Sequence, residues 1–177
     1  YNTPGQNERS FLASDKLFVS SVNYGLGMIR NNEYQPISGS EFLIGNVITA
    51  ILPHQNNSYL ILLENGMIYN LKDNAFTKWS SSAEFLKDSG INTALLLRNK
   101  DIAIGTQNNG VVILSPTGEV KLHLTKNKGL SHRTVLSLYQ DRCDNLWVGL
   151  NNGLSMVELS SPFSIIDEQL GLPGTGY

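Results

Sequence analysis

One pattern, a short apolar strand followed by a glycine-containing hairpin, occurs four times in this chain at nearly constant spacing. The most regular copy is Leu-Trp-Val-Gly-Leu-Asn-Asn-Gly-Leu at residues 146–154, and weaker copies lie at 102–111, 59–67 and 17–26. Successive turn glycines are 41, 44 and 43 residues apart, and these are Gly25, Gly66, Gly110 and Gly153. A strand-rich unit that repeats every roughly 40–50 residues is typical of propeller blades.

Two further series of segments keep the same period. Segments with an apolar first position and a small hydroxyl residue at the third position begin at Val47, Ile91 and Val135. Short alternating segments follow the turn glycines by nine or ten residues, beginning at Tyr34, Phe76, Val120 and Phe163. The sequence therefore predicts an all-β propeller segment of about four four-stranded antiparallel blades. The predicted units lie near residues 8–44, 45–88, 89–132 and 133–173, with a helical turn near 80–88 and no long amphipathic helix.

The number of units indicates whether this chain can form a closed propeller ring. A single sheet of this kind leaves two apolar faces in water, and neighbouring sheets in a ring cover them. Four units are few for a closed ring. We therefore expect this chain to be a piece of a larger propeller, or to pair with a second copy as a homodimer.

Composition excludes several classes of partner. The net charge is -2 and charged residues make up 16%, which argues against nucleic acid, because binding to a phosphate backbone needs clustered Lys and Arg. No stretch approaches the roughly 18 apolar residues that span a bilayer, so membrane attachment is expected only through a segment outside this chain. The single cysteine, Cys143, excludes an internal disulfide and a cysteine-based zinc site, and leaves the compartment open. Because residue 1 is Tyr, we expect this chain to be a mature or excised segment. The lack of a signal peptide therefore does not reveal its location.

The fourth unit carries a more specific motif. A Gly-Leu lead-in at 129–130 precedes an apolar strand that ends at Asp141, followed by Leu-Trp-Val-Gly at 146–149 and the Asn-Gly-Leu hairpin. This arrangement resembles the two-component regulator propeller repeat. Asp144 stands where the turn of that repeat usually has Gly, and Leu150 replaces a usual Thr. The third unit keeps part of the motif, and the first two units match in spacing alone.

The resemblance implies a fold and a function. Such repeats form seven-bladed propellers outside the inner membrane, ahead of a Y-Y-Y domain, a membrane helix and a histidine kinase. Many belong to hybrid two-component sensors of gut Bacteroidetes that respond to glycan fragments. The resemblance thus implies a periplasmic sensor segment that binds a small molecule, with oligosaccharides as the expected class. Its expected partners are the remaining blades, the Y-Y-Y domain and the kinase of the same polypeptide.

Candidate binding residues follow from propeller geometry. Propeller ligands generally lie over the central opening, where inter-unit connections and hairpin loops of one face converge. The candidates are His132, Arg133, Trp79, Glu84 and Lys128. Arg133 is suited to clamp a carboxylate or sulfate, and Trp79 to stack on a ligand or to pack at an edge strand. Trp147 lies mid-strand, which favours a structural role in the core between blades; the turn glycines and Asp141 are also assigned to the structural repeat.

The sequence offers little support for catalysis. Residues 141–147 also resemble the Asp box of sialidase propellers, which is itself a structural turn, and the five arginines share no register that would form a sialidase site. The three histidines lie far apart, without the convergent ligands of a metal site. We therefore predict no catalytic residue, no metal and no cofactor. A propeller glycosidase or polysaccharide lyase, and a protein-interaction scaffold, remain the alternative functions.

Overall fold

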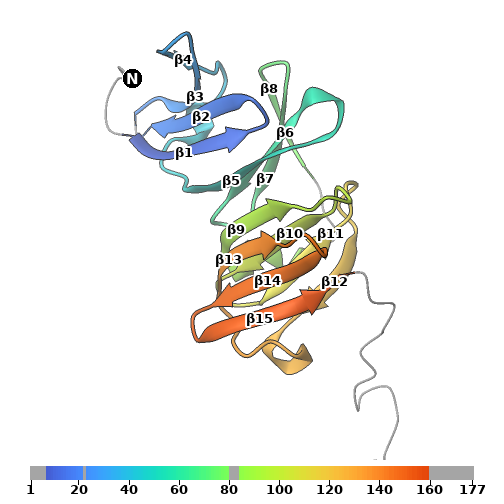
Figure 1. Ribbon diagram of the computed structural model, residues 1–177. Coiled ribbons are helices and arrows are strands. Elements are labelled where there is room, and N and C mark those ends of the chain that lie inside the picture. Colours follow the sequence, from blue (N-terminus) through green and yellow to red (C-terminus); the bar gives the residue numbers. More distant parts are fainter. Residues whose placement is uncertain (1–6, 22, 80–83, 160–177) are drawn as a thin grey trace, which may run out of the picture.

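The computed structural model describes residues 7–21, 23–79 and 84–159, and in these residues four antiparallel sheets follow one another along the chain (Figure 1). The first sheet contains β1 (Asn7–Ala13), β2 (Lys16–Ser21), β3 (Gly25–Arg30) and β4 (Glu33–Pro36). The second contains β5 (Ile48–Pro53), β6 (Tyr59–Leu63), β7 (Ile68–Lys72) and β8 (Ala75–Lys78). The third contains β9 (Ile91–Leu96), β10 (Ile102–Thr106), β11 (Val111–Leu114) and β12 (Val120–Leu124). The fourth contains β13 (Val135–Gln140), β14 (Asn145–Leu150) and β15 (Gly153–Glu158).

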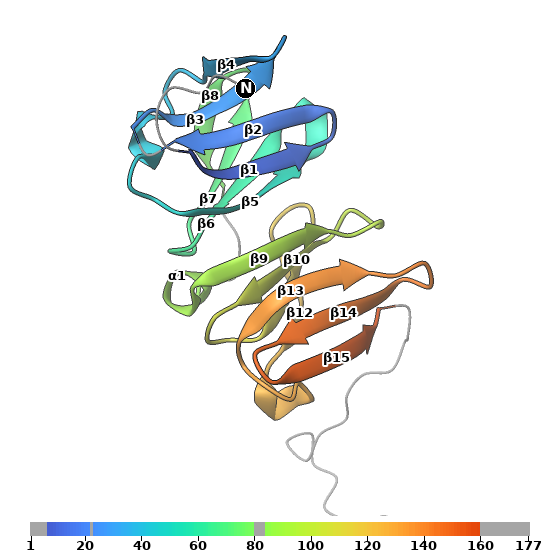
Figure 2. The ribbon, with the colours of Figure 1, turned by 60° about the vertical axis from the view of Figure 1, so that its left-hand side comes forward.

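Each sheet is a meander, because the strands pair in the order in which they occur in the chain. The first strands of successive sheets, β1, β5, β9 and β13, lie next to one another, and the sheets stack sideways along the molecule (Figure 2). The predicted all-β propeller fold is therefore confirmed. The strand expected to begin at Phe163 lies outside the described residues, so the fourth sheet has three described strands.

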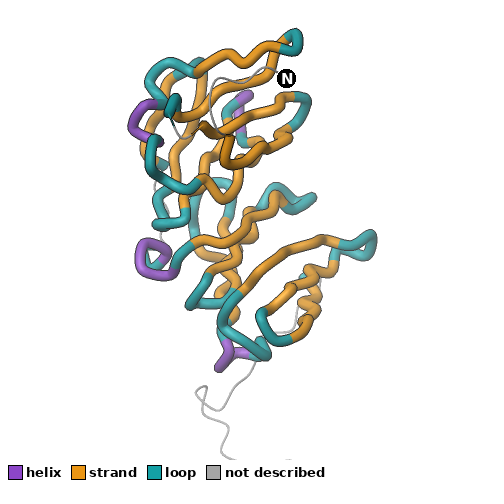
Figure 3. The backbone as a smooth tube through the Cα atoms, turned by 90° about the vertical axis from the view of Figure 1, so that its left-hand side faces the viewer, coloured by secondary structure: helices purple, strands orange, loops and turns teal. Residues whose placement is uncertain are grey.

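Helical segments are short and lie between strands (Figure 3). They are η1 (Glu41–Leu43), η2 (Gln55–Asn57), α1 (Leu86–Ser89) and η3 (Lys126–Lys128). The helix α1 overlaps the end of the helical turn predicted near 80–88, of which residues 80–83 lie outside the described residues. None of the helices in the described part of the chain is long and apolar enough to cross a membrane.

Burial between sheets explains why these segments form strands. All five residues of β6 and of β10 are buried, since these strands have a neighbouring sheet on each face. Three apolar clusters fill the three spaces between successive sheets. Each buried Leu, Ile or Phe side chain contributes about 1.5–3 kcal/mol relative to exposure, so sideways stacking supplies the main stabilisation.

The strand directions give the stack two edges. We call the edge with the β1–β2, β5–β6, β9–β10 and β13–β14 turns the hairpin edge. The opposite edge, with the turns between second and third strands and with the segments that join successive sheets, we call the connection edge. The described residues of the joining segments are 37–47, 79 and 84–90, and 125–134.

The turn glycines allow the backbone to approach closely at the connection edge. Gly25, Gly66 and Gly110 all have positive φ, at 72°, 82° and 69°. A Cβ atom on any of them would also collide with a backbone carbonyl oxygen at the connection edge of the same sheet. These oxygens belong to Ser40 and Leu86 in joining segments and to Leu124 at the end of β12. Glycine is thus required by close contact as well as by backbone conformation.

Candidate functional site

The five residues predicted to bind ligand lie on segments of the connection edge, and the structure does not gather them. Lys128, His132 and Arg133 belong to the segment between β12 and β13, whereas Trp79 and Glu84 belong to the segment between β8 and β9. Within the described residues, the hydrogen bonds and ion pairs found join no two of these side chains. Glu84, Lys128 and Arg133 are exposed. Their role in binding stays a prediction.

Two of these five side chains have structural contacts. Trp79 packs against the core between the second and third sheets and meets the His54 ring edge-to-face, with the ring centroids 6.0 Å apart. Burial lowers the pKa of His54. His132 Nδ1 accepts a hydrogen bond of 3.1 Å from the Thr134 backbone N–H, which orders the start of β13.

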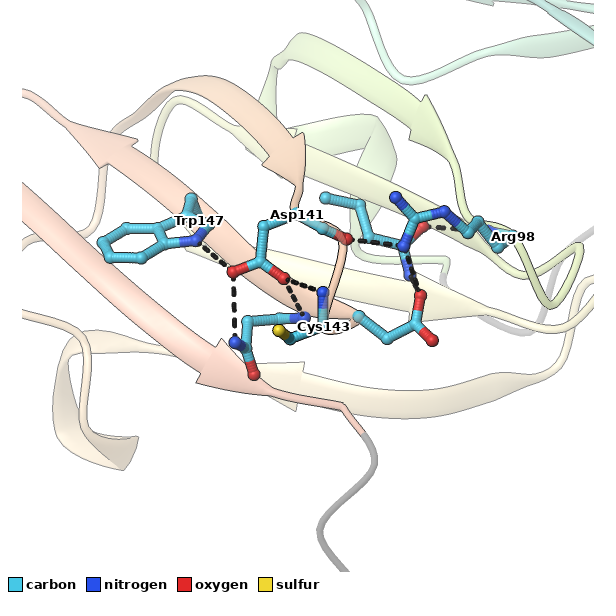
Figure 4. A network of polar contacts seen from close by, with 7 residues as sticks. Arg98, Asp141, Cys143 and Trp147 are labelled. Carbon is cyan, nitrogen blue, oxygen red and sulfur yellow. Dashed lines mark hydrogen bonds and ion pairs between the residues drawn. The ribbon is translucent and has the colours of Figure 1, made fainter.

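Asp141 organises the turn between β13 and β14 (Figure 4). Its carboxylate accepts hydrogen bonds from the backbone N–H groups of Cys143 and Asn145, at 2.8 and 3.0 Å. It also accepts from the Asn145 side chain at 3.1 Å and from the Trp147 indole at 2.8 Å. These bonds, with that of the Trp147 indole the largest contribution, lower the pKa of the Asp141 carboxyl. The carboxylate is saturated with donors of its own turn, which is a structural arrangement.

Trp147 lies on the face of the fourth sheet that points away from the third sheet, so its predicted packing between blades stays a prediction. Alternate residues of β14 face the third sheet, so Leu146, Val148 and Leu150 fill that core. Trp147 points to the other face of the fourth sheet, where it pairs across strands with Tyr139 and Met156. No described sheet covers this face, and Trp147 is only half-buried. Successive side chains of a strand point to opposite faces of the sheet, and this alternation decides the orientation of Trp147. The apolar sequence around Trp147 does not show which face it occupies.

Arg98 joins the third and fourth sheets at the hairpin edge (Figure 4). Its guanidinium contacts Asp144 Oδ1 at 2.6 Å and donates to the Asp141 carbonyl oxygen. The Arg98 backbone N–H donates to Gln140 Oε1 at 2.9 Å. Asp144 has the positive φ of 65° that explains the usual glycine of the repeat, and its carboxylate adds an ion pair that glycine lacks.

A cavity of about 420 Å³ lies between the first and second sheets at the hairpin edge. This volume is within the range of small-molecule sites. Its buried floor is formed by Phe18, Met28, Tyr59 and Leu71, and its rim by Lys16, Arg30, Asn57, Asp73 and Asn74. None of these residues is among the candidates predicted from the sequence, although the adjacent Asp73 and Asn74 signal a two-residue turn. We take this cavity as the candidate binding site.

The described residues contain no group of three or more His, Cys, Asp or Glu side chains that could hold a metal ion. Cys143 is exposed with a free thiol.

Comparison with known proteins supports the sequence motif and the fold. Residues 129–152 match the family described as two component regulator propeller. No curated protein matches the sequence. The fold and this match together define a β-propeller segment, and the resemblance to the two-component regulator propeller repeat is confirmed over those residues.

Solved structures show the same fold. The extracellular domain of a hybrid two-component system from B. thetaiotaomicron is similar with a TM-score of 0.58 and 21% identity, over 86% of this chain and 20% of that chain. The extracellular domain of a one-component system from the same organism is similar with a TM-score of 0.62 and 17% identity, over 85% of this chain and 21% of that chain. Virginiamycin B lyase from Staphylococcus aureus is similar with a TM-score of 0.64 and 12% identity, over 92% of this chain and 59% of that chain. This chain thus spans about a fifth of the length of the first two proteins.

Proposed function

We propose that this chain is a non-catalytic, ligand-sensing part of the extracytoplasmic input region of a two-component sensor. The observation that carries the proposal is the two-component regulator propeller match at residues 129–152, on a chain that folds as a propeller segment. Its similarity to extracellular domains of two bacterial regulatory systems supports it. In this proposal the segment lies in the periplasm, and membrane helix and kinase belong to other parts of the polypeptide.

The ligand in this proposal is a small molecule, with glycan fragments as the first class to test. A ligand that contacts two neighbouring sheets favours the arrangement in which those sheets are held together. If the propeller has two arrangements relative to the following domain, the ligand shifts their populations by its difference in affinity for them. The segment needs no reaction chemistry for this role.

The proposed partners are further blades of the same polypeptide. The outer face of the fourth sheet exposes Leu136, Tyr139, Leu154 and Met156, each more than half exposed. An apolar face of this kind is normally covered. We propose that another blade covers it in the full-length protein, and that a second copy does so when this chain is isolated.

An enzyme is the alternative, since virginiamycin B lyase shares the fold. That similarity concerns the fold and identifies no residue of this chain as part of a lyase site. In the described residues, Asp141 is occupied by its own turn, so the Asp-box resemblance supplies no free carboxylate.

Thermal unfolding with a panel of glycan oligosaccharides tests the proposal. A ligand at about 100 times its Kd stabilises the folded state by about 2.7 kcal/mol, which raises the Tm of a chain of this size by about 5–10 °C. Unchanged oligosaccharides in the recovered sample support a sensor. Product formation by the purified chain would establish an enzyme instead. A protein partner captured with no shift by any small molecule would establish a scaffold.

A further inference from the structure

Two cationic side chains, those of Lys16 and Arg30, line the cavity between the first and second sheets. Leu17 pairs with Ile29 and Phe18 with Met28 across β2 and β3, so the next step of the same register places Lys16 opposite Arg30. Lys16, Phe18, Met28 and Arg30 all line the cavity. Like charges directly opposite on neighbouring strands destabilise a sheet, and an anion between them removes that repulsion.

The nearby acidic residues form no ion pair with either cation in the described residues. Glu33 is opposite Arg30 on β4, yet it forms no ion pair with Arg30 and does not line the cavity. Asp73 lines the opposite rim, and no ion pair joins it to Lys16 or Arg30 in the described part of the chain. The wall formed by the first sheet is thus cationic.

Contacts across the two sheets hold one of these cations in place. The Lys16 ammonium lies 5.0 Å from the centroid of the Tyr59 ring. The Tyr59 ring is itself fixed by Phe18, edge-to-face at a centroid distance of 5.0 Å. This cation–π contact orients the ammonium at the junction of the two sheets and reduces the side-chain entropy that is lost on binding an anion.

The opposite rim suits hydroxyl groups. Asn57, Asp73 and Asn74 are exposed residues of two turns of the second sheet, with φ values of 56°, 49° and 62°. Their amides donate and accept hydrogen bonds, and the carboxylate accepts them. Their side chains are engaged in no hydrogen bond found within the described residues. The floor of Phe18, Met28, Tyr59 and Leu71 is apolar and suits the C–H groups of a ring.

We propose that this cavity binds a small polyhydroxylated carboxylate, of which a uronic acid is the simplest example. Its carboxylate lies between Lys16 and Arg30, and its hydroxyl groups bond to Asn57, Asp73 and Asn74. The ligand bridges the first and second sheets at the hairpin edge. This inference names a ligand class and a site for the proposed sensor, and it rests on that function for its biological meaning.

Calorimetry on the 177-residue chain with D-glucuronate tests the site. We expect glucuronate to bind, D-glucose to bind at least about tenfold more weakly because it lacks the charge, and glucuronate affinity to fall as salt is added. The double variant Lys16→Gln/Arg30→Gln should lose binding. The matched control Lys87→Gln/Lys126→Gln removes two exposed lysines elsewhere and should retain it. Equal binding of glucose, or binding retained in the Lys16/Arg30 variant, overturns the proposal.

The Asp73→Asn variant separates a polyhydroxylated carboxylate from any small anion. Acetate should bind this variant more tightly, because a negative charge is removed from the rim. Glucuronate should bind it more weakly, because a hydroxyl acceptor is lost. If glucuronate also binds more tightly, the assignment of hydroxyl recognition to this rim is wrong.

The same measurements distinguish failure of the proposed cavity site from failure of the proposed sensor function. Glucuronate binding that is lost in Arg133→Gln and retained in Lys16→Gln/Arg30→Gln overturns this site and supports a sensor that binds at the connection edge. No glucuronate binding at all overturns the site alone, since the oligosaccharide panel tests the sensor independently. Binding followed by turnover supports the cavity and overturns the non-catalytic function.

Discussion

Protonation of Asp141 directly affects the turn between β13 and β14. Its carboxylate accepts four hydrogen bonds within one turn, and its pKa in the folded protein is lowered. A carboxyl with a lowered pKa in the folded state stabilises that state above the pKa of the unfolded chain, about 3.9. The stabilisation is lost as pH falls through the lower folded-state pKa.

We therefore expect Asp141→Asn to lower the Tm by a few degrees at pH 7, and by progressively less as pH falls from 5 towards 3. The asparagine keeps the size of the side chain and loses one acceptor and the charge. Thermal unfolding across this pH range provides the measurement. Asp88→Asn, which removes an exposed carboxylate, serves as the control. A Tm difference for Asp141→Asn that stays constant down to pH 3 would contradict the lowered pKa.

The turn glycines differ in what surrounds them, and this difference is testable. Gly110→Ala would place a Cβ against the Leu124 carbonyl oxygen and 3.0 Å from Leu130 Cδ1. Gly153 also has positive φ, at 104°, but a Cβ there meets no described atom within 4 Å. The left-handed conformation costs alanine about 1–2 kcal/mol at either position.

We expect Gly153→Ala to show only that conformational cost, and Gly110→Ala to lose about 3–4 kcal/mol in total because the backbone must also shift. Urea unfolding of the two variants measures both free energies. Equal losses would show that backbone conformation alone requires these glycines.

At the scale of strands and turns, Arg98 links two successive sheets. It joins the β9–β10 turn to the β13–β14 turn through Asp144, Asp141 and Gln140. The Arg98 and Asp144 side chains are 52% and 53% exposed, so solvent screens the pair. Exposed ion pairs contribute about 0.2–1 kcal/mol.

Removing Arg98 should therefore have a small, salt-dependent effect. We expect Arg98→Ala to cost about 1 kcal/mol at low ionic strength, and less in 1 M NaCl, where the Debye length falls to about 3 Å. Lys100→Ala, at an exposed position of the same turn, provides the control. Denaturant unfolding at two salt concentrations measures the free energy of unfolding of each variant. A large loss of this free energy that salt does not change would show that packing of the Arg98 side chain matters more than its charge.

At the scale of the whole molecule, the stack of sheets ends in an apolar face. Leu136, Tyr139, Leu154 and Met156 of the fourth sheet are 53–63% exposed, and Trp147 lies beside Tyr139 and Met156. The first sheet ends similarly with Leu12, which is 74% exposed. Sideways burial stabilises each inner sheet, and the outer faces lack it among the described residues.

We expect the isolated 177-residue chain to self-associate through the fourth sheet. The double variant Leu136→Lys/Leu154→Lys places two charges on that face and should shift the chain towards monomer in sedimentation velocity. Ala75→Lys/Thr77→Lys adds the same charge to exposed positions of β8 and should leave association unchanged. A chain that remains monomeric at high concentration would contradict a second copy as the occupant of this face.

Sequence periodicity predicted the strands well because strand and turn formation depend on residues close together in the chain. The spacing of Gly66, Gly110 and Gly153 located three hairpins, and the segments beginning near Val47, Ile91 and Val135 are the first strands of their sheets. Periodicity did not show that Trp147 points away from the third sheet, because the face to which a strand residue points depends on the exact register. It also could not show that Gly110 faces the carbonyl oxygen of Leu124.

The sequence by itself determined the repeat, the all-β architecture and the sideways order of the sheets, since all three follow from a local pattern that recurs. Only the tertiary structure decided which residues meet between sheets. Lys16 and Arg30 come together with Asn57 and Asp73 because two separately formed sheets pack at a particular depth and twist. Contacts of that kind join segments some 40 residues apart, and no local sequence signal specifies them.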